Sequence, residues 1–172
     1  MQIRRLSPAD AKSFQALRLF ALQEKSSAFG SSHEEELALP MATIAARLME
    51  KSDRGIWGAF EGDELVGLLG LARENMRKLS HKASLWGMYV APAARGRGVA
   101  RALLLEVLAF IRTVPAVMQV NLSVNAANLV AIALYESEGF IVFGQEACAL
   151  MIEGEPHDEL HMCLRLSAAI SA

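Results

Sequence analysis

A short segment rich in arginine and glycine, Arg95-Gly96-Arg97-Gly98, is the part of this sequence best suited to hold a ligand. It follows an apolar run that ends at Pro92 and precedes the most regular helical pattern in the chain. Glycines let the backbone approach a ligand closely, and the first N–H groups of a helix have no partner within the helix. A helix N-terminus attracts anions, and the two arginines add positive charge. The segment therefore predicts a site for a phosphate or pyrophosphate group.

Two common nucleotide-binding motifs do not fit this segment. A Walker loop would need Gly-Lys-Ser/Thr, which does not follow here. The dinucleotide fingerprint would need a third glycine at position 101, where the chain has Arg101. The remaining alternative to a phosphate site is a glycine-rich turn with two solvated arginines.

The apolar pattern around the segment indicates what must position it. Val99 to Ile111 repeats at helical spacing, and Ala83 to Val90 is apolar on both faces, as in a central strand. Two apolar runs around Gly62-Asp63 predict a hairpin. The expected strands are 2–6, 56–60, 65–71, 83–90, 118–124, 141–151 and 159–166, and the expected helices are 10–21, 40–51, 99–111 and 128–137. This order predicts an α/β domain with a mixed sheet and helices on its faces.

Composition bounds the classes of protein that remain. The 172 residues are 53% hydrophobic with a net charge of −2, which excludes a disordered chain and argues against a general nucleic-acid binder. No apolar run approaches the roughly 20 residues of a membrane helix, and the N-terminus does not read as a signal peptide. We therefore expect no membrane partner and a cytoplasmic location. Cys148 and Cys163 are too few for a disulfide framework.

No metal is expected. His157, Glu159, His161 and Cys163 lie on one face of the last expected strand. Four neighbours in a line along a strand do not converge on one ion.

Two motifs resemble those of the GNAT acetyltransferase family. Arg95 to Ala100 fits Arg/Gln-x-x-Gly-x-Gly/Ala, the coenzyme A pyrophosphate loop of that family. A second hallmark is resembled by Asn128, Ala131, Leu134, Tyr135, Gly139 and Phe140. The order of elements is also similar from about Ile3 to Leu166. The resemblance implies one domain over 1–172, with a mostly antiparallel seven-stranded sheet, helices on both faces and splayed central strands.

The resemblance implies acetyl transfer from acetyl-CoA to an amine by direct attack in a ternary complex. The backbone of Met88 and Val90 would hold the pantetheine arm, with the Met88 N–H as the oxyanion donor. Tyr135 would protonate the departing thiolate, because a phenol is protonated at neutral pH. The cofactor-binding positions so implied are Met88, Tyr89, Val90, Arg95, Gly96, Arg97, Gly98, Val99, Ala100, Asn128 and Tyr135.

The acceptor side is less well defined. Ser84 occupies the position where many members of the family place a glutamate that serves as the base. The acceptor residues implied are Phe29, Glu34, Glu35 and Trp86, with the acidic pair forming a lip that would attract a small cationic amine or a protein amino group. The candidates for the base stay open, and they are Glu34, Glu35, Glu36, His81, Glu153, Glu155 and His157.

Two other functions remain as alternatives. One is a non-catalytic acyl-CoA sensor or interaction module on the same fold. The other is a phosphate-ligand or RNA-binding domain that uses the basic residues Arg73, Arg77, Lys78, Arg95 and Arg97. Because members of the family are often dimers, a homodimer is among the partners that the resemblance implies.

Overall fold

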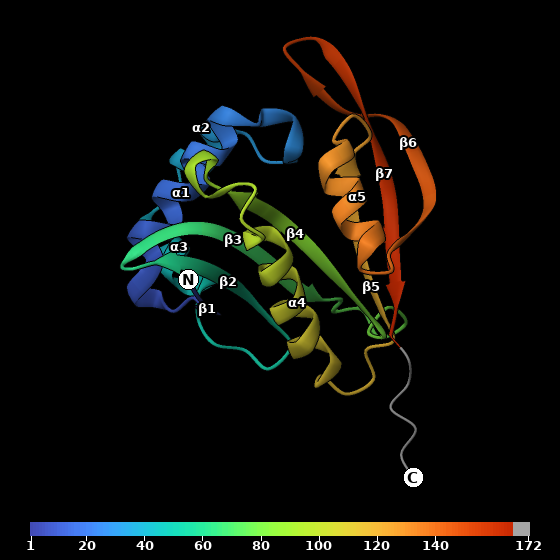
Figure 1. The fold of residues 1–172 in the computed structure, drawn as a ribbon, viewed down its shortest axis with the longest axis horizontal. Helices are drawn as coiled ribbons and strands as arrows, with labels where there is room; N and C mark the ends of the chain where they lie inside the picture. Colours follow the sequence, from blue (N-terminus) through green and yellow to red (C-terminus); the bar gives the residue numbers. More distant parts are fainter. Residues whose placement is uncertain (167–172) are drawn as a thin grey trace.

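The computed structural model describes residues 1–166, which form one mixed sheet covered by helices on both faces (Figure 1). The strand order is β1-β2-β3-β4-β5-β7-β6. The strands are β1 Gln2–Arg5, β2 Arg54–Glu61, β3 Glu64–Arg73, β4 Lys82–Val90, β5 Gln119–Asn125, β6 Ile141–Ile152 and β7 Glu155–Arg165. The helices are α1 Ala11–Glu24, α2 His33–Leu37, α3 Met41–Arg47, α4 Val99–Arg112 and α5 Leu129–Ser137, with 3-10 turns at Pro8–Asp10, Ser26–Ala28 and Pro92–Ala94.

The expected order of strands and longer helices is confirmed, and so is the mixed seven-stranded sheet. The segment 26–39, expected as loop or partial helix, forms a 3-10 turn and the short helix α2. The main differences are at element ends. The helix expected over 40–51 ends at Arg47, and Asn128 caps α5 rather than belonging to it. The last strand begins at Glu155, four residues before the expected start, because the chain turns tightly at Glu153-Gly154 and pairs at once with β6.

Two apolar cores lie on opposite faces of the sheet. The expected row on α4, which includes Val99, Leu103, Val107 and Ile111, is buried against one face together with Tyr135 of α5. Phe14 and Ala21 of α1 and Ile44 of α3 are buried against the other face. Because helices cover both faces of the sheet, side chains on both faces of the central strands are buried. Burial of apolar surface stabilises the fold, so these strands are almost wholly apolar.

The sheet divides between β4 and β5, which is the feature that shapes the site. These two parallel strands pair only over 82–84 and 119–121, and then separate. On its other edge, β4 carries one extra residue between its pairs with Leu68 and Gly70. Gly87 lies in this bulge with φ +67°, a conformation that glycine adopts without strain. A gap bounded by two strands and a bulge therefore opens at the centre of the molecule.

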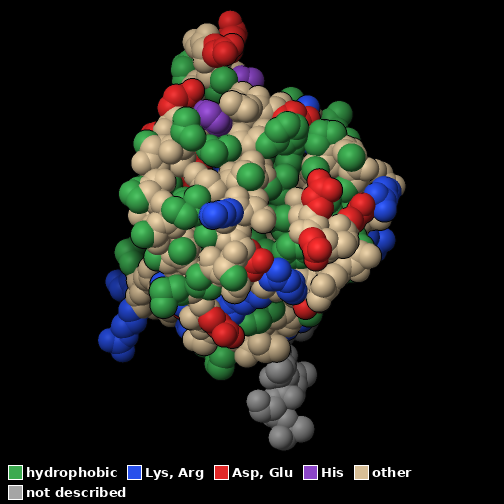
Figure 2. Space-filling view, turned by 90° about the vertical axis from the view of Figure 1, so that its left-hand side faces the viewer, with side chains coloured by type: hydrophobic (Ala, Val, Ile, Leu, Met, Phe, Trp, Pro, Cys, Tyr) green, Lys and Arg blue, Asp and Glu red, His purple; other side chains and the backbone are tan. Residues whose placement is uncertain are grey.

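The surface carries interspersed charges. On the face shown in Figure 2, small groups of acidic and basic side chains are scattered among uncharged ones, and the β6–β7 hairpin protrudes at the top. Within residues 1–166, no helix has the length and hydropathy needed to cross a membrane. Cys148 and Cys163 are both free thiols, and only Cys163 is buried.

Candidate functional site

A cleft of about 660 Å³ lies where the loop before α4 meets the gap between β4 and β5, and we call it the loop cleft. It is lined by every position implied for the cofactor except Arg97. These lining residues are Met88, Tyr89, Val90, Arg95, Gly96, Gly98, Val99, Ala100, Asn128 and Tyr135. The folded chain thus brings together two motifs that lie more than 20 residues apart in the sequence.

The loop itself presents unpaired backbone donors to the cleft. Gly96 and Gly98 have φ of +72° and +78°, and a Cβ at either would meet only open space. The first helical hydrogen bond of α4 runs from Ala102 N to Gly98 O, which leaves the N–H groups of Val99 and Ala100 without a helical acceptor. Such a row of N–H groups is suited to the oxygens of a phosphate or pyrophosphate.

The two arginines of the loop have different roles from one another. Arg95 pairs with Glu24 at the end of α1, where Nη1 lies 2.9 Å from Oε1, and it also donates from Nε to Val90 O at 2.9 Å. Arg97 pairs with Glu61 at 2.8 Å and does not line the cleft. Arg95 is thus a brace for the loop, and Arg97 is engaged outside the cleft.

The backbone of β4 faces the gap at two residues. Ala91 N donates to Val66 O and Tyr89 pairs with Leu68, so strand alternation turns the backbone groups of Met88 and Val90 away from β3. Because the carbonyl of Val90 already accepts from Arg95, its N–H is the group left for a ligand. Tyr89 is held differently, since its hydroxyl donates to Glu24 Oε2 at 2.6 Å.

Helix α5 supplies the opposite wall of the loop cleft. Asn128 Oδ1 accepts from Ala131 N at 3.2 Å and so caps the helix. Tyr135 is only 6% exposed and packs edge-on against Phe140. Burial raises the pKa of Tyr135 to about 12, so its hydroxyl keeps its proton at neutral pH.

Four polar residues of the loop cleft, Lys25, Ser27, Arg101 and Asn125, were not singled out from the sequence. Asn125 bridges the gap, because its Nδ2 donates to Ser27 O at 3.1 Å while its Oδ1 accepts from Ala127 N. Lys25 adds positive charge to the lining, while Arg101 pairs with Glu138, its Nε lying 2.6 Å from Oε1. Arg101 occupies the position where the dinucleotide fingerprint would need its third glycine. That position, three residues after Gly98, could have indicated that Arg101 lies beside the loop.

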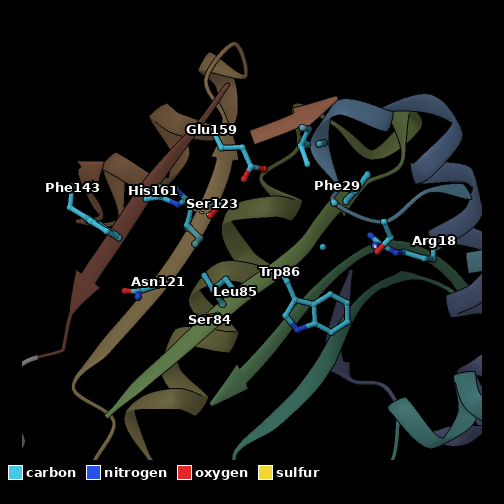
Figure 3. Close-up of a pocket in the computed structure, with 16 residues that line it drawn as sticks. Arg18, Phe29, Ser84, Leu85, Trp86, Asn121, Ser123, Phe143, Glu159 and His161 are labelled. Carbon is cyan, nitrogen blue, oxygen red and sulfur yellow. Dashed lines mark hydrogen bonds between the residues drawn. The ribbon is translucent and has the colours of Figure 1, made fainter. Parts of the chain in front are cut away.

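A second cavity of about 530 Å³, the strand cavity, lies on the other side of the bulge (Figure 3). On β4 its lining ends at Gly87, whereas the lining of the loop cleft begins at Met88. The two cavities share Ala28 and Phe29. The remaining residues of the strand cavity are Arg18, Gly30, Ser31, Ser84, Leu85, Trp86, Asn121, Leu122, Ser123, Phe143, Leu150, Glu159 and His161.

A hydroxyl, an imidazole and a carboxylate form a chain at one wall of the strand cavity. Ser123 Oγ lies 2.9 Å from His161 Nδ1, and His161 Nε2 lies 3.1 Å from Glu146 Oε2. Ser123 and His161 lie side by side on β5 and β7 in Figure 3. When Nε2 carries the proton and donates to Glu146, Nδ1 is able to accept the Ser123 proton. The arrangement can therefore take a proton from a ligand in the cavity.

Ser84 and Trp86 line the strand cavity beside this chain. Ser84 Oγ donates to Glu74 Oε1 at 3.0 Å, so a carboxylate lies one hydrogen bond behind the serine. The Trp86 indole packs on Gly70, where an added Cβ would lie 2.2 Å from the ring. Gly70 therefore leaves the space that lets Trp86 lie flat at the floor of the cavity.

The acidic segment lies elsewhere. Among the described residues, Glu34 and Glu35 line neither cavity. Glu35 instead accepts from Ser32 N at 3.0 Å in a capping box that starts α2, a role that the Ser-x-x-Glu spacing could have predicted. Glu36 is buried and pairs with Arg47. The chain therefore has no acidic lip at the strand cavity from this segment.

No cluster of three or more His, Cys, Asp or Glu side chains within residues 1–166 is placed to hold a metal ion. His161, one of the four residues on one face of β7 that could have resembled metal ligands, forms hydrogen bonds with Ser123 and Glu146. Among the open candidates for the base, His81, Glu153, Glu155 and His157 also lie outside the strand cavity lining.

Comparison with known proteins shows the same architecture. A family model described as Acetyltransferase (GNAT) family matches residues 17–140. A GNAT acetyltransferase of Streptococcus pneumoniae is 20% identical with a TM-score of 0.86, covering 96% of this chain and 99% of that chain. A putative acetyltransferase of Salmonella typhimurium, solved with its cofactor acetyl-CoA, is 20% identical with a TM-score of 0.81, covering 100% and 97%.

A third structure is the ribosomal-protein-alanine N-acetyltransferase of Brucella melitensis. It is 24% identical with a TM-score of 0.80 and covers 96% of this chain and 100% of that chain. At these identities the likeness shows a shared fold. The search of curated proteins found no match.

Proposed function

Because the chain belongs to the GNAT acetyltransferase family, we propose that it transfers an acetyl group from acetyl-CoA to an amine by direct attack in a ternary complex. The observation that carries the proposal is the meeting of two cavities at the bulge of β4. One cavity has donors for a pyrophosphate, and the other has a proton-accepting chain. A donor and an acceptor substrate bound in these two cavities would meet near Met88.

The residues of the loop cleft fit acetyl-CoA. The open space at Gly96 and Gly98, with the free N–H groups of Val99 and Ala100, suits the pyrophosphate. Lys25 offers positive charge to a further phosphate, whereas Arg101 already pairs with Glu138. The N–H groups of Met88 and Val90, which face the gap, suit the amide and thioester carbonyls of the pantetheine arm.

When bound, acetyl-CoA supplies a thioester whose C–S bond breaks as the C–N bond of the new amide forms. The Met88 N–H would stabilise negative charge on the carbonyl oxygen, a task that needs a fixed donor rather than a particular side chain. Tyr135 would give its proton to the departing thiolate, because its hydroxyl is protonated at neutral pH. The proton that Tyr135 loses is replaced from the attacking nitrogen.

The acceptor must lose another proton before it attacks, because an amine is an ammonium at neutral pH. Ser123 Oγ would accept this proton while passing its own to Nδ1 of His161. The carboxylate of Glu146 would stabilise the imidazolium that forms. The hydrogen-bonded series of Ser123, His161 and Glu146 would thus do the work of the base that many family members place on the central strand, where this sequence has Ser84.

The test combines binding with turnover. Acetyl-CoA binding is measured by calorimetry, and thiol release is then followed with a panel of small amines, amino acids and peptides. We expect saturable binding of acetyl-CoA and turnover on one class of amine. Binding without turnover on any acceptor would favour the acyl-CoA sensor, and absence of binding would refute both functions.

A further inference from the structure

Arg18 is a buried cation whose charge is not paired within the described residues. It lies on α1, is 5% exposed, and lines the strand cavity. Its guanidinium stacks on the Phe29 ring with Cζ 4.6 Å from the centroid. Nη2 reaches Ser31 Oγ only at 3.4 Å, and Nη1 has no hydrogen-bond partner among residues 1–166. Figure 3 shows the guanidinium directed towards the middle of the cavity.

The nearest acidic group does not neutralise Arg18. The carboxylate of Glu36 is held by Arg47 at 2.5 Å, and none of the ion pairs within residues 1–166 includes Arg18. Burial lowers the pKa of Arg18, and the charge of Glu36 compensates only in part, so the guanidinium is left desolvated without a hydrogen-bonded anion. Phe29 offsets part of this cost and fixes the plane of the guanidinium. An anion that enters the cavity would therefore gain a desolvated and pre-oriented partner.

We propose that Arg18 binds a carboxylate of the acceptor, so that the acceptor is a small amine of amino-acid size rather than a polyamine or a lysine side chain. This inference rests on the proposed function, because it names the acceptor of the same reaction. It replaces the cationic acceptor that the acidic segment had suggested, since that segment does not reach the cavity.

The position of Arg18 limits the length of the acceptor. A Cβ on Gly87 would lie 3.5 Å from Arg18 Nη1, and Gly87 adjoins Met88, where the thioester carbonyl is proposed to bind. Only a few bonds can therefore separate the carboxylate from the attacking nitrogen, as in an α- or β-amino acid. Ser123 and Glu159 lie on the facing wall and provide oxygen acceptors for the ammonium, and His161 Nδ1 accepts from Ser123 Oγ.

The test compares acceptors that differ only in the carboxylate. Leucine is paired with 3-methylbutylamine, phenylalanine with phenethylamine and tyrosine with tyramine, within a panel of the common L-amino acids. We expect kcat/KM to favour the carboxylate by at least about 100-fold for the preferred pair. In Arg18→Gln the preference should fall below about tenfold, with KM for acetyl-CoA changed less than about threefold.

Two further variants control for folding and charge. Arg18→Lys keeps the charge but not the two-pronged geometry, and we expect it to recover part of the preference. Lys12→Gln removes an exposed cation of the same helix α1 that lines neither cavity, and it should keep the preference of the wild type. Circular dichroism of each variant separates a folding defect from lost recognition.

A second readout keeps this inference separate from the proposed function. The thermal shift produced by each L-amino acid is measured in the presence of CoA, and a shift lost in Arg18→Gln supports the carboxylate site even without turnover. Equal turnover of amines with and without the carboxylate would overturn the inference and leave the acetyltransferase standing. Failure of every amino acid to bind or react would also overturn it. Failure of acetyl-CoA to bind would instead refute the proposed function.

Discussion

Glu24 at the end of α1 accepts from both Arg95 and Tyr89, so one carboxylate joins the first helix to the loop before α4 and to the central strand. Glu24 Oε1 lies 2.9 Å from Arg95 Nη1, and Glu24 Oε2 lies 2.6 Å from the Tyr89 hydroxyl. These hydrogen bonds, that of Arg95 first, lower the pKa of Glu24 to about 2. The loop cleft is therefore braced by residues that are about 65 to 71 positions apart.

The brace predicts a loss of stability in acid. The pKa of Glu24 is below its ordinary value of 4.5 in the folded chain, so the unfolded chain binds more protons between these values. The contribution of Glu24 should be complete above about pH 5 and disappear as the pH falls towards about 2. Urea midpoints across this range should fall less steeply in Glu24→Gln than in the wild type. The exposed Glu106, replaced in the same way, should leave the slope unchanged; equal slopes for all three proteins would contradict the prediction.

Tyr135→Phe removes the proposed acid and little else. The phenyl ring can keep its packing against Phe140, so we expect the variant to fold normally. The value of kcat should fall by about 100-fold or more, within the usual range for general acid catalysis. Calorimetric affinity for acetyl-CoA should change by less than about threefold. An unchanged kcat would remove Tyr135 from the mechanism.

Gly98→Ala tests the loop. An alanine at φ +78° costs about 1–2 kcal/mol, and relief of that strain would shift the first N–H groups of α4. We expect affinity for acetyl-CoA to fall by about tenfold, measured by calorimetry.

Gly154 offers a matched control for this substitution. It has φ +83° and open space at its Cβ, but it lies in the hairpin between β6 and β7. Gly154→Ala should cost similar stability and leave acetyl-CoA affinity unchanged. Equal affinities for the two variants would show that the loop conformation does not matter for binding.

The proton route can be assigned by three substitutions. His161→Gln and Ser123→Ala should each lower kcat by about 100-fold, because each breaks the chain that ends at Glu146. Glu74→Gln removes the carboxylate behind Ser84 and should change kcat by less than about threefold. Rates are measured with saturating acetyl-CoA and the preferred acceptor. The reverse result, with Glu74→Gln severe and His161→Gln mild, would place the route through Ser84.

Much of the fold follows from local sequence patterns. The apolar row from Val99 to Ile111 predicts a helix with one buried face, and the alternation over 118–124 predicts a strand. The structure has both, as α4 and β5. Gly62-Asp63 makes the two-residue hairpin that its type indicates, with Gly62 at φ +59°. The ends of elements were less predictable. Asn128, for example, lies just before α5 as its N-cap, because its side chain accepts a hydrogen bond from Ala131 N that residue spacing alone does not reveal.

The acceptor side was harder to predict for a physical reason. The role proposed for His161 depends on Ser123 and Glu146, which are 38 and 15 positions away, and that of Arg18 depends on its having no ion pair within residues 1–166. Such relationships depend on strand register and burial rather than on local patterns. Glu35, in contrast, is held by its capping partner Ser32, a local relationship that the Ser-x-x-Glu spacing carries.

The bulge at Gly87 has a consequence for how such a protein can diversify. Because β4 serves one cavity up to Gly87 and the other from Met88 onward, and because the cavities share only Ala28 and Phe29, most substitutions touch one side alone. Under the proposed function, changes at Arg18, Trp86 or Ser123 would alter acceptor binding and leave the residues proposed to bind acetyl-CoA in place. The extra residue in β4 would then let selection change the acceptor without changing the donor.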